Sequence, residues 1–320
     1  MQGRQWAGVA VAALLIAGAP ACSPNDPPGG GDRYSIATGG SGGVYQVYGG
    51  GLAELMTDEL DDAPTTAETT SASVDNLTLV AGHDSDIAFT LSDTAIDAVK
   101  GQASFDHPLD LRALATIYPN ITQVAVKADS GIERIEDLAG KTVSVGSPNS
   151  GTEVIALRLL EIAGLDPEDD IAKRGLGVGE SVQAMRDGSI DALFWSGGVP
   201  TGAITDLTTS DDVRMLALDG YLAPLKERFG PAYEEAEIEE GEYDGVPATP
   251  TIGVPNLLMV ASDMDEELAF RITRLLFDGK ERLATVHKAA ESLDPETAQE
   301  IVDPVRLHPG AARFYEEAAR

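Results

Sequence analysis

The chain is poor in the residues that cross-link a fold, hold metals or contact nucleic acid. Its 320 residues include one cysteine and four histidines, and 53 acidic residues against 22 basic ones give a formal net charge of −31. One cysteine rules out an intrachain disulfide, and the isolated histidines show no zinc-binding spacing. Contact with phosphates needs a basic surface, so this acidity argues against nucleic acid as a partner. We expect no metal and no cofactor.

Long apolar runs are also scarce, and the clearest one lies at the start of the chain. Residues 6–18 are apolar and follow Arg4, but the run is too short to span a bilayer comfortably. Small residues then lead to Cys22. This pattern predicts a signal peptide over residues 1–21, so that the mature protein works outside the cytoplasm.

The position of the single cysteine resembles the bacterial lipoprotein signal, in which the cysteine becomes the lipidated first residue. Ala19 and Pro20 depart from that signal, which prefers leucine and a small residue at these places. The alternative is ordinary cleavage that leaves Cys22 as a free thiol. Residues 22–32 are interpreted as the lipidated cysteine and a flexible Pro/Gly-rich tether. The expected protein faces the outside of the cell membrane and touches the membrane through its lipid anchor only.

The most informative stretch is residues 36–45, IATGGSGGVY. It is typical of a strand end followed by a glycine-rich turn, which permits tight or left-handed backbone, and then a helix. From Val44 onward the apolar residues recur at helical spacing. The free N–H groups and the dipole of a helix start favour an anion such as a carboxylate. We therefore interpret this loop as one half of a ligand clamp.

A second copy of the same plan begins near residue 141. A strand over residues 142–145 leads through the turn GSPNSG to a helix over residues 152–163. In both copies a short helix and a buried strand follow, with Ser73 and Ser92 as expected helix caps in the first copy and Pro200 opening a later helix in the second. This alternation predicts two α/β lobes built on parallel sheets.

Two extended segments, residues 115–126 and 253–260, are interpreted as crossings between the lobes. They place lobe 1 at residues 33–118 and 260–320 and lobe 2 at residues 119–259, with both glycine or serine loops on one cleft that closes around a ligand. The acidic run 234–244 is interpreted as a solvated loop or helix. Amphipathic helices after residue 266 are expected to pack on lobe 1.

Residues 39–43 match the G-x-S-x-G nucleophile elbow, a pattern typical of serine hydrolases. In an α/β-hydrolase several strands precede that elbow, whereas here only one does, and no histidine lies in a setting that marks a general base. P-loop and Rossmann fingerprints are absent from the sequence. The chain thus offers binding groups without a catalytic constellation, and we expect it not to be an enzyme.

The binding groups are of three kinds. Backbone N–H groups at residues 42–45 and 150–152 are suited to carboxylate oxygens. Hydroxyl groups of the serines and threonines near these loops can orient a ligand. Aromatic side chains at Tyr45, Tyr118 and Trp195 can form walls of the cleft, although Trp195 at a strand end is equally compatible with a place in the core.

Taken together and in order, several segments resemble the TAXI-type solute-binding proteins of TRAP transporters. They are TGGSGGVY, SVDNLTLVAG, IYPN, KTVSVGSPNSGTE and DGSIDALFW, and the resemblance runs from about residue 34 to residue 260. It implies a type II periplasmic-binding-protein fold of two α/β lobes joined by two hinge crossings. It also implies capture of a small organic anion, glutamate or a related dicarboxylate or amino acid, and delivery to the membrane subunits of a TRAP permease.

The resemblance adds the helix start at Asn76 to the candidate contacts. The full set of predicted ligand-binding residues is Gly40, Ser41, Val44, Tyr45, Asn76, Ser92, Tyr118, Ser147, Ser150, Gly151, Thr152, Trp195 and Gly198. Two alternatives to a transport receptor stay open on the sequence. One is a serine hydrolase or other enzyme on a two-lobed α/β scaffold, and the other is a ligand-binding sensor subunit for a membrane kinase.

Overall fold

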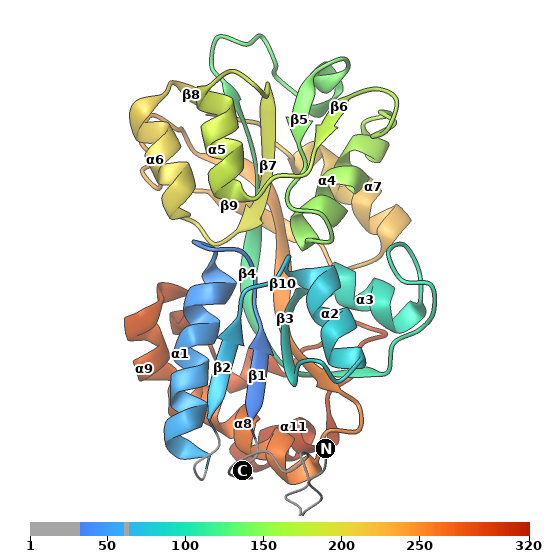
Figure 1. Cartoon of the computed structure of the whole chain (residues 1–320), viewed down its shortest axis with the longest axis vertical. Coiled ribbons are helices and arrows are strands. Elements are labelled where there is room, and N and C mark those ends of the chain that lie inside the picture. The colour runs from blue at the N-terminus through green and yellow to red at the C-terminus, as the bar shows by residue number, and fades with distance from the viewer. Residues whose placement is uncertain (1–32, 61–63) are drawn as a thin grey trace, which may run out of the picture. The chain divides into compact units, whose positions relative to one another are not determined.

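The computed structural model of the chain describes residues 33–60 and 64–320 (Figure 1). The predicted signal peptide, the tether and Cys22 lie outside these residues. Within the described part, two α/β lobes share a pair of long strands, with lobe 1 in the lower half of Figure 1 and lobe 2 in the upper half. Among the described residues, no helix combines the length and the apolar character that crossing a membrane requires.

The elements follow the chain in a simple order. Lobe 1 begins with β1 (Tyr34–Ala37), α1 (Val44–Glu59), β2 (Thr65–Glu68), α2 (Ser73–Ala81), β3 (Ile87–Leu91) and α3 (Ser92–Lys100). The long strand β4 (Leu111–Lys127) then enters lobe 2, which contains η1 (Ile135–Leu138), β5 (Thr142–Ser144), α4 (Gly151–Ile162), β6 (Ala172–Arg174), α5 (Val178–Arg186), β7 (Ala192–Gly197), α6 (Gly202–Ser210), β8 (Val213–Met215), α7 (Asp219–Phe229) and β9 (Glu234–Ile238). Strand β10 (Thr249–Ala261) returns to lobe 1, which ends with α8 (Glu266–Asp278), α9 (Lys280–Val286), η2 (Lys288–Ser292), α10 (Pro295–Ala298) and α11 (Pro309–Ala318).

The sheet is mixed, and this corrects the expectation of parallel sheets. Strand β1 pairs in parallel with β2 and β3, and β5 pairs in parallel with β6 and β7. Strands β4 and β10 run antiparallel to each other, β10 to β3 and β4 to β7. The reason lies in the crossings themselves, because one takes the chain into lobe 2 and the other brings it back. Both predicted crossings are therefore present, as β4 and β10.

The internal repeat is confirmed by the topology. In each lobe the first strand lies between the other two parallel strands, and the third strand pairs with a crossing. The registers match as well, since Ile36 pairs with Ile87 in lobe 1 and Val143 pairs with Ala192 in lobe 2. In each lobe the first strand leads into a loop that starts a helix, which is α1 in lobe 1 and α4 in lobe 2.

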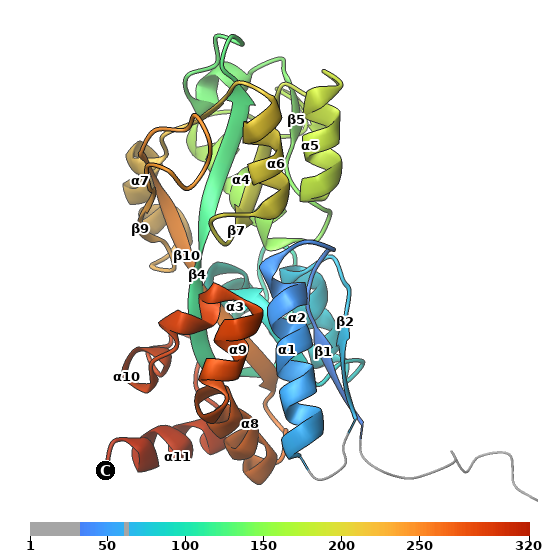
Figure 2. The same ribbon diagram turned by 90° about the vertical axis from the view of Figure 1, so that its left-hand side faces the viewer.

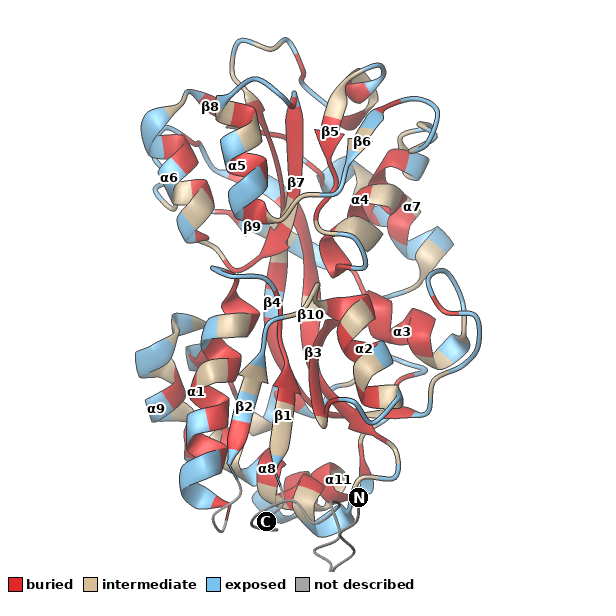
Figure 3. Ribbon diagram, in the orientation of Figure 1, coloured by how far each residue is buried: buried red, intermediate tan, exposed pale blue. Residues whose placement is uncertain are grey.

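Each lobe has its own core, and the crossings contribute to both. Lobe 1 is packed around α1, β1, β3 and the C-terminal helices, while lobe 2 is packed around α4, β5, β7 and α7. Figure 3 shows β4 and β10 as mostly buried strands that pass through both lobes. The amphipathic helices α8 and α11 pack on lobe 1 as expected, with Phe270, Ile272 and Phe314 in its core.

Several predicted helix starts are displaced. Ser73 and Ser92 are the first residues of α2 and α3 and not caps, since the residues before them, Ala72 and Leu91, occupy the cap positions. Helix α4 begins at Gly151, where Ser150 is a true cap whose Oγ accepts a hydrogen bond of 3.1 Å from Glu153 N. Pro200 precedes α6 without opening it, because that helix begins at Gly202.

The acidic run after residue 234 was expected to be a loop or helix, and its first part is instead the strand β9. This strand pairs with β10 along the edge of lobe 2, with Ile238 buried and Glu234, Glu235 and Glu237 exposed. Exposed charged side chains on an edge strand discourage pairing with another chain.

Candidate functional site

A cavity of about 520 Å³ lies between the lobes and is lined by residues of both. Its size is within the range of small-molecule sites. The lining residues are Gly39, Gly40, Ser41, Gly43, Val44, Tyr45, Ser71, Ala72, Ser73, Leu91, Tyr118, Asn120, Ser147, Ser150, Gly151, Thr152, Gly177, Val178, Gly179, Glu180, Trp195, Ser196 and Gly197. The two loops that the sequence singled out therefore do meet on one cavity.

Two helices direct their N-termini at this cavity, one from each lobe. In α1 the amides of Val44 and Tyr45 have no acceptor inside the helix, as is general for a first turn. In α4 the Ser150 side chain satisfies Glu153 N, which leaves the amides of Gly151 and Thr152 available. Each such N-terminus is equivalent to roughly half a positive charge. A ligand between them therefore meets two electropositive helix ends.

A third helix N-terminus reaches the same cavity and was not predicted. Helix α5 begins at Val178, and both Val178 and Gly179 line the cavity. Its first amides also lack acceptors inside the helix. The glycine-rich stretch of residues 175–179 carried the signal, because it repeats the pattern of glycines directly before a helix that identified the first loop.

The hydroxyl groups of the lining are arranged as donors. Oxygens of Ser73, Ser150 and Thr152 each accept a hydrogen bond from a backbone amide, from Leu91 at 3.2 Å, Glu153 at 3.1 Å and Ser196 at 3.2 Å respectively. The hydroxyl protons of Ser150 and Thr152 therefore remain free to point elsewhere, and both residues line the cavity. A ligand rich in acceptor oxygens suits such a lining.

Two further lining hydroxyls are buried and have no hydrogen-bond partner in the described part of the chain. They are Tyr118 OH and Ser196 Oγ, on residues that are 4% and 5% exposed. Burial raises the pKa of the Tyr118 phenol well above its ordinary value, and the neighbouring phenols of Tyr45 and Tyr48 act in the same direction. Tyr118 is thus a neutral donor, and a buried polar group of this kind is normally satisfied by a ligand or water.

The charge of the lining is nearly neutral. Glu180 is the one charged side chain among the lining residues, and its Oε2 accepts a hydrogen bond from Gly177 N at 3.1 Å. No lysine, arginine or histidine is among them. No histidine lines the cavity together with Ser41, and no group of metal-binding side chains was found in the described residues. The lining therefore presents helix N-termini and hydroxyl groups with a single carboxylate.

A chain of side-chain hydrogen bonds forms the base of the cavity at the hinge. Tyr45 OH of lobe 1 donates to Asn256 Oδ1 in β10, and Asn256 Nδ2 donates to Asn120 Oδ1 in β4 at 2.9 Å. Asn120 Nδ2 in turn donates to Ser196 O of lobe 2 at 3.2 Å. The chain of bonds connects a predicted ligand residue in one lobe with a cavity-lining strand in the other.

The two asparagines sit at equivalent places in the crossings. Each follows a proline, and Pro119 and Pro255 face each other in the ladder between β4 and β10. Proline has no N–H to donate, so this point of the ladder has fewer hydrogen bonds, and the register shifts directly after it, between Pro255 and Leu257. The sequence showed both Pro-Asn pairs, but their pairing with each other depends on a register that only the structure reveals.

Ten of the thirteen predicted residues line the cavity, and the other three do not. Asn76 is fully buried behind it, where Nδ2 donates to Thr38 O at 2.6 Å and to Phe89 O at 2.7 Å. Ser92 is fully buried at the start of α3. Gly198 lies beside Val44, whose Cγ2 would be 2.8 Å from a Cβ on that glycine, so Gly198 permits close approach of the lobes.

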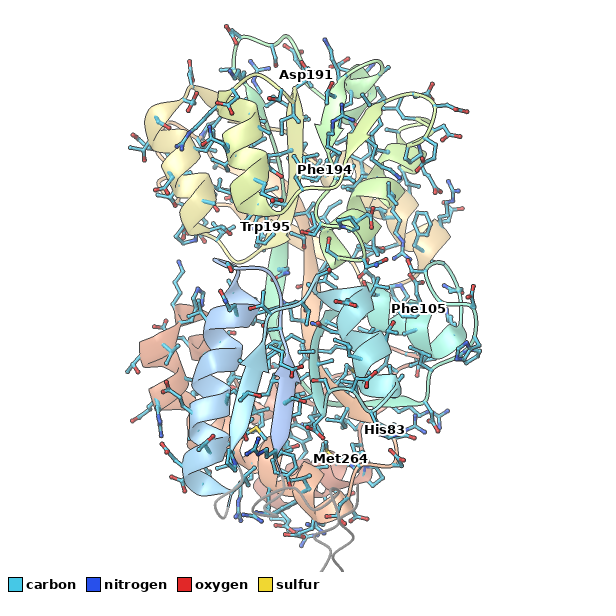
Figure 4. The ribbon with its side chains drawn as sticks, viewed as in Figure 1. His83, Phe105, Asp191, Phe194, Trp195 and Met264 are labelled. Atoms are coloured by element: carbon cyan, nitrogen blue, oxygen red, sulfur yellow. The ribbon has the colours of Figure 1, made fainter. Side chains whose placement is uncertain are left out.

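The three aromatic residues that were predicted as walls of the cleft, Tyr45, Tyr118 and Trp195, all line the cavity. Trp195 lies at the end of lobe 2 that faces lobe 1 (Figure 4), and its Nε1 donates to Thr201 Oγ1 at 2.8 Å. The indole ring comes within 3.7 Å of the place where a Cβ on Gly43 would be. Trp195 therefore touches both lobes at the cavity.

Comparison with known proteins agrees with this architecture. A model of the NMT1-like family matches residues 36–318, nearly all of the described chain. The chain belongs to the NMT1-like family.

Solved structures of low sequence identity share the fold. The periplasmic aliphatic sulphonate binding protein SsuA of Escherichia coli is 17% identical to this chain and gives a TM-score of 0.51. The alignment covers 82% of this chain and 76% of SsuA. MatC of Rhodopseudomonas palustris with bound malate is 14% identical, with coverages of 89% and 96% and a TM-score of 0.55. A putative L-cystine ABC transporter protein of Listeria monocytogenes is 15% identical, with coverages of 81% and 94% and a TM-score of 0.51. The chain has the two-lobed α/β fold of periplasmic binding proteins of type II.

Proposed function

We propose that the protein is an extracytoplasmic receptor that captures a small organic anion by closing its two lobes. The observation that carries this proposal is the donor character of the cavity. Three helix N-termini and a set of hydroxyl donors converge on it, and Glu180 is the one carboxylate among its lining residues. Oriented amides and hydroxyls in a partly enclosed space stabilise negative charge without needing a cationic side chain.

The class of anion is inferred from the positive charge of the helix ends at the cavity and from the ligands of other proteins with this fold. Three helix ends supply roughly 1.5 positive charges in total, and the Glu180 carboxylate offsets about one of them, so the hydroxyl donors share in holding a carboxylate. Malate bound by MatC and sulphonates bound by SsuA show that proteins of this fold hold anions. The TAXI resemblance points to glutamate or a related dicarboxylate or amino acid, and this is the ligand we propose.

The proposed partners and location come from the sequence. The TAXI motifs support delivery to the membrane subunits of a TRAP permease, and a lipid on Cys22 would hold the receptor at the outer face of the membrane. We propose hinge points near residues 119 and 259, which divide the chain into the lobes given above. Support for the first comes from the facing prolines Pro119 and Pro255, where the strand ladder is weakened. A gene for a TRAP membrane subunit beside this one would favour the transport role over a sensor subunit.

A thermal-shift screen tests the proposed ligand class. The panel pairs anions with amines of matched length, such as succinate with 1,4-diaminobutane, and includes glutamate, malate, keto acids and sulphonates. At a free concentration of about 100 times Kd, binding stabilises the folded state by about 2.7 kcal/mol, which raises the Tm of a chain of this size by about 4 °C. We expect shifts with some of the anions and none with the amines. A flat profile across all anions would contradict the receptor proposal.

A further inference from the structure

Outside the cavity, helix α4 carries a second set of contacts between the lobes. One face of the helix packs into the core of lobe 2 through Ile155, Leu159 and Leu160. Gly151, Val154 and Arg158 recur at the spacing of a different helical face. Val154 packs against the core of lobe 1, and Gly151 lies so close to lobe 1 that a Cβ there would meet Leu91. The same helix therefore presents its N-terminus to the ligand and its side to the opposite lobe.

The strongest of these contacts is a buried ionic cluster around Arg158. Its guanidinium donates to Asp93 Oδ2 at 3.1 Å and to Asp97 Oδ2, both on α3 of lobe 1, and to Tyr233 OH at 2.6 Å. The side chains of Arg158, Asp93 and Asp97 are 7%, 0% and 2% exposed. Phe229 of lobe 2 lies under the guanidinium, with its ring centre 4.8 Å away.

Each carboxylate of the cluster is shared between the lobes. Asp93 Oδ1 accepts from Thr94 N at 2.6 Å, and Asp97 Oδ1 accepts from Gln102 Nε2 at 2.8 Å, both within lobe 1. The second oxygen of each carboxylate faces Arg158. Although burial alone would lower the pKa of Arg158, the two carboxylates hold it above its ordinary value, so the cation persists. If the lobes separated, water would reach both partners and the lobes themselves would stay folded.

We propose that Arg158 is a positioning residue, whose ion pairs with Asp93 and Asp97 hold α4 against lobe 1 and so keep the helix N-terminus in place across the ligand cavity. This inference rests on the proposed receptor function, because the position of the helix N-terminus matters only where a ligand binds. The ion pairs themselves hold the lobes together in the absence of any ligand. Arginine suits the task because its rigid planar group spreads several donors over two carboxylates and a phenol, whereas a lysine offers a single point charge.

The structure provides a reporter for the docked arrangement that needs no ligand. The amides of Val74 and Asp75, in the first turn of α2 in lobe 1, donate to Asn149 O of lobe 2 at 3.1 and 3.4 Å. Neither amide has an acceptor within its own helix at that position. Their hydrogen exchange is therefore slow only while α4 is docked on lobe 1.

Hydrogen exchange of the ligand-free full chain tests the proposal. In the Arg158→Met variant, which leaves two buried carboxylates without a cation, we expect protection of Val74 and Asp75 to fall at least tenfold. Paired amides of β3 and β7 should keep their protection, because each lobe remains folded. The matched control is Arg228→Met, since Arg228 also lies over the Phe229 ring but pairs with Glu161 inside lobe 2. This control should exchange like the unaltered protein.

A neutral rescue separates the ionic role from a packing role. Combining Arg158→Met with Asp93→Asn and Asp97→Asn removes the uncompensated charge and should restore much of the lost protection. The proposal is overturned if Val74 and Asp75 are unprotected in the unaltered protein, if Arg158→Met leaves them protected, or if β3 and β7 lose protection equally. Because no ligand is added, these results stand apart from the outcome of the thermal-shift screen.

Discussion

Replacing Gly151 with alanine is expected to weaken anion binding at least tenfold. Gly151 is the first residue of α4, and a Cβ there would lie 2.5 Å from Leu91 Cδ1 and 2.6 Å from Ser73 Oγ, both in lobe 1. Leu91 is buried and cannot turn aside freely. The lobes would therefore stop short of full closure, and a tenfold loss corresponds to about 1.4 kcal/mol.

Calorimetric titration with the strongest anion of the thermal-shift panel measures this effect. Gly202→Ala is the matched control, because Gly202 is also the first residue of a helix in lobe 2 but has no atom within 4 Å of a Cβ placed on it. The control should bind like the unaltered protein. Equal affinity in the Gly151→Ala variant would show that ligand capture does not need the close approach of α4 to lobe 1.

Replacing Asn76 with alanine is expected to lower the free energy of unfolding by about 3 kcal/mol. The side chain is fully buried and donates to Thr38 O, directly after β1, and to Phe89 O, within β3, while its Oδ1 accepts from Thr70 Oγ1. Alanine would remove the hydrogen bonds to the two carbonyls, and an unsatisfied buried group costs roughly 1–3 kcal/mol before relaxation. Denaturant unfolding of the variant measures the loss.

The same variant distinguishes a structural role of Asn76 from the ligand contact that the TAXI resemblance implies. Thr78→Ala, at an exposed position of the same helix, controls for helix propensity and should leave the free energy of unfolding nearly unchanged. If Asn76→Ala kept its stability and lost anion affinity, the contact role would be right and the structural role wrong.

The repeat and the two loops could be predicted because their signals are local. Glycines before Val44 and the SPNSG segment before Thr152 mark helix starts within a few residues, and both starts line the cavity. Strand and helix alternation gave the two-lobed α/β plan in the same way. The mixed sheet was missed because the direction of β4 and β10 depends on where the chain goes next, which periodicity does not encode.

Helix caps show where local reasoning stops. Ser73, Ser92 and Ser150 all stand near a helix start, yet only Ser150 accepts a hydrogen bond from its own helix. The Ser73 hydroxyl instead accepts from Leu91 N, 18 residues away in sequence. A donor from a neighbouring strand thus decides the role of Ser73, and the sequence does not show which strand will be near.

The contacts between the lobes were beyond prediction for the same physical reason. Arg158 meets Asp93 and Asp97 at sequence separations of 65 and 61 residues, and Asn256 meets Asn120 at a separation of 136. Such pairs depend on how two separately folded lobes meet. No spacing rule for helices or strands covers them.

Trp195 provides the most direct test that an anion enters the cleft. The chain has two tryptophans, at positions 6 and 195, so the full chain with Trp6→Phe has one, and that one lines the cavity and touches both lobes. Titration of this variant with the anions of the panel, followed by tryptophan fluorescence, should give a saturable change with the same anions that raise the Tm, and none with the matched amines. Fluorescence that stays constant through saturating anion would contradict capture between the lobes.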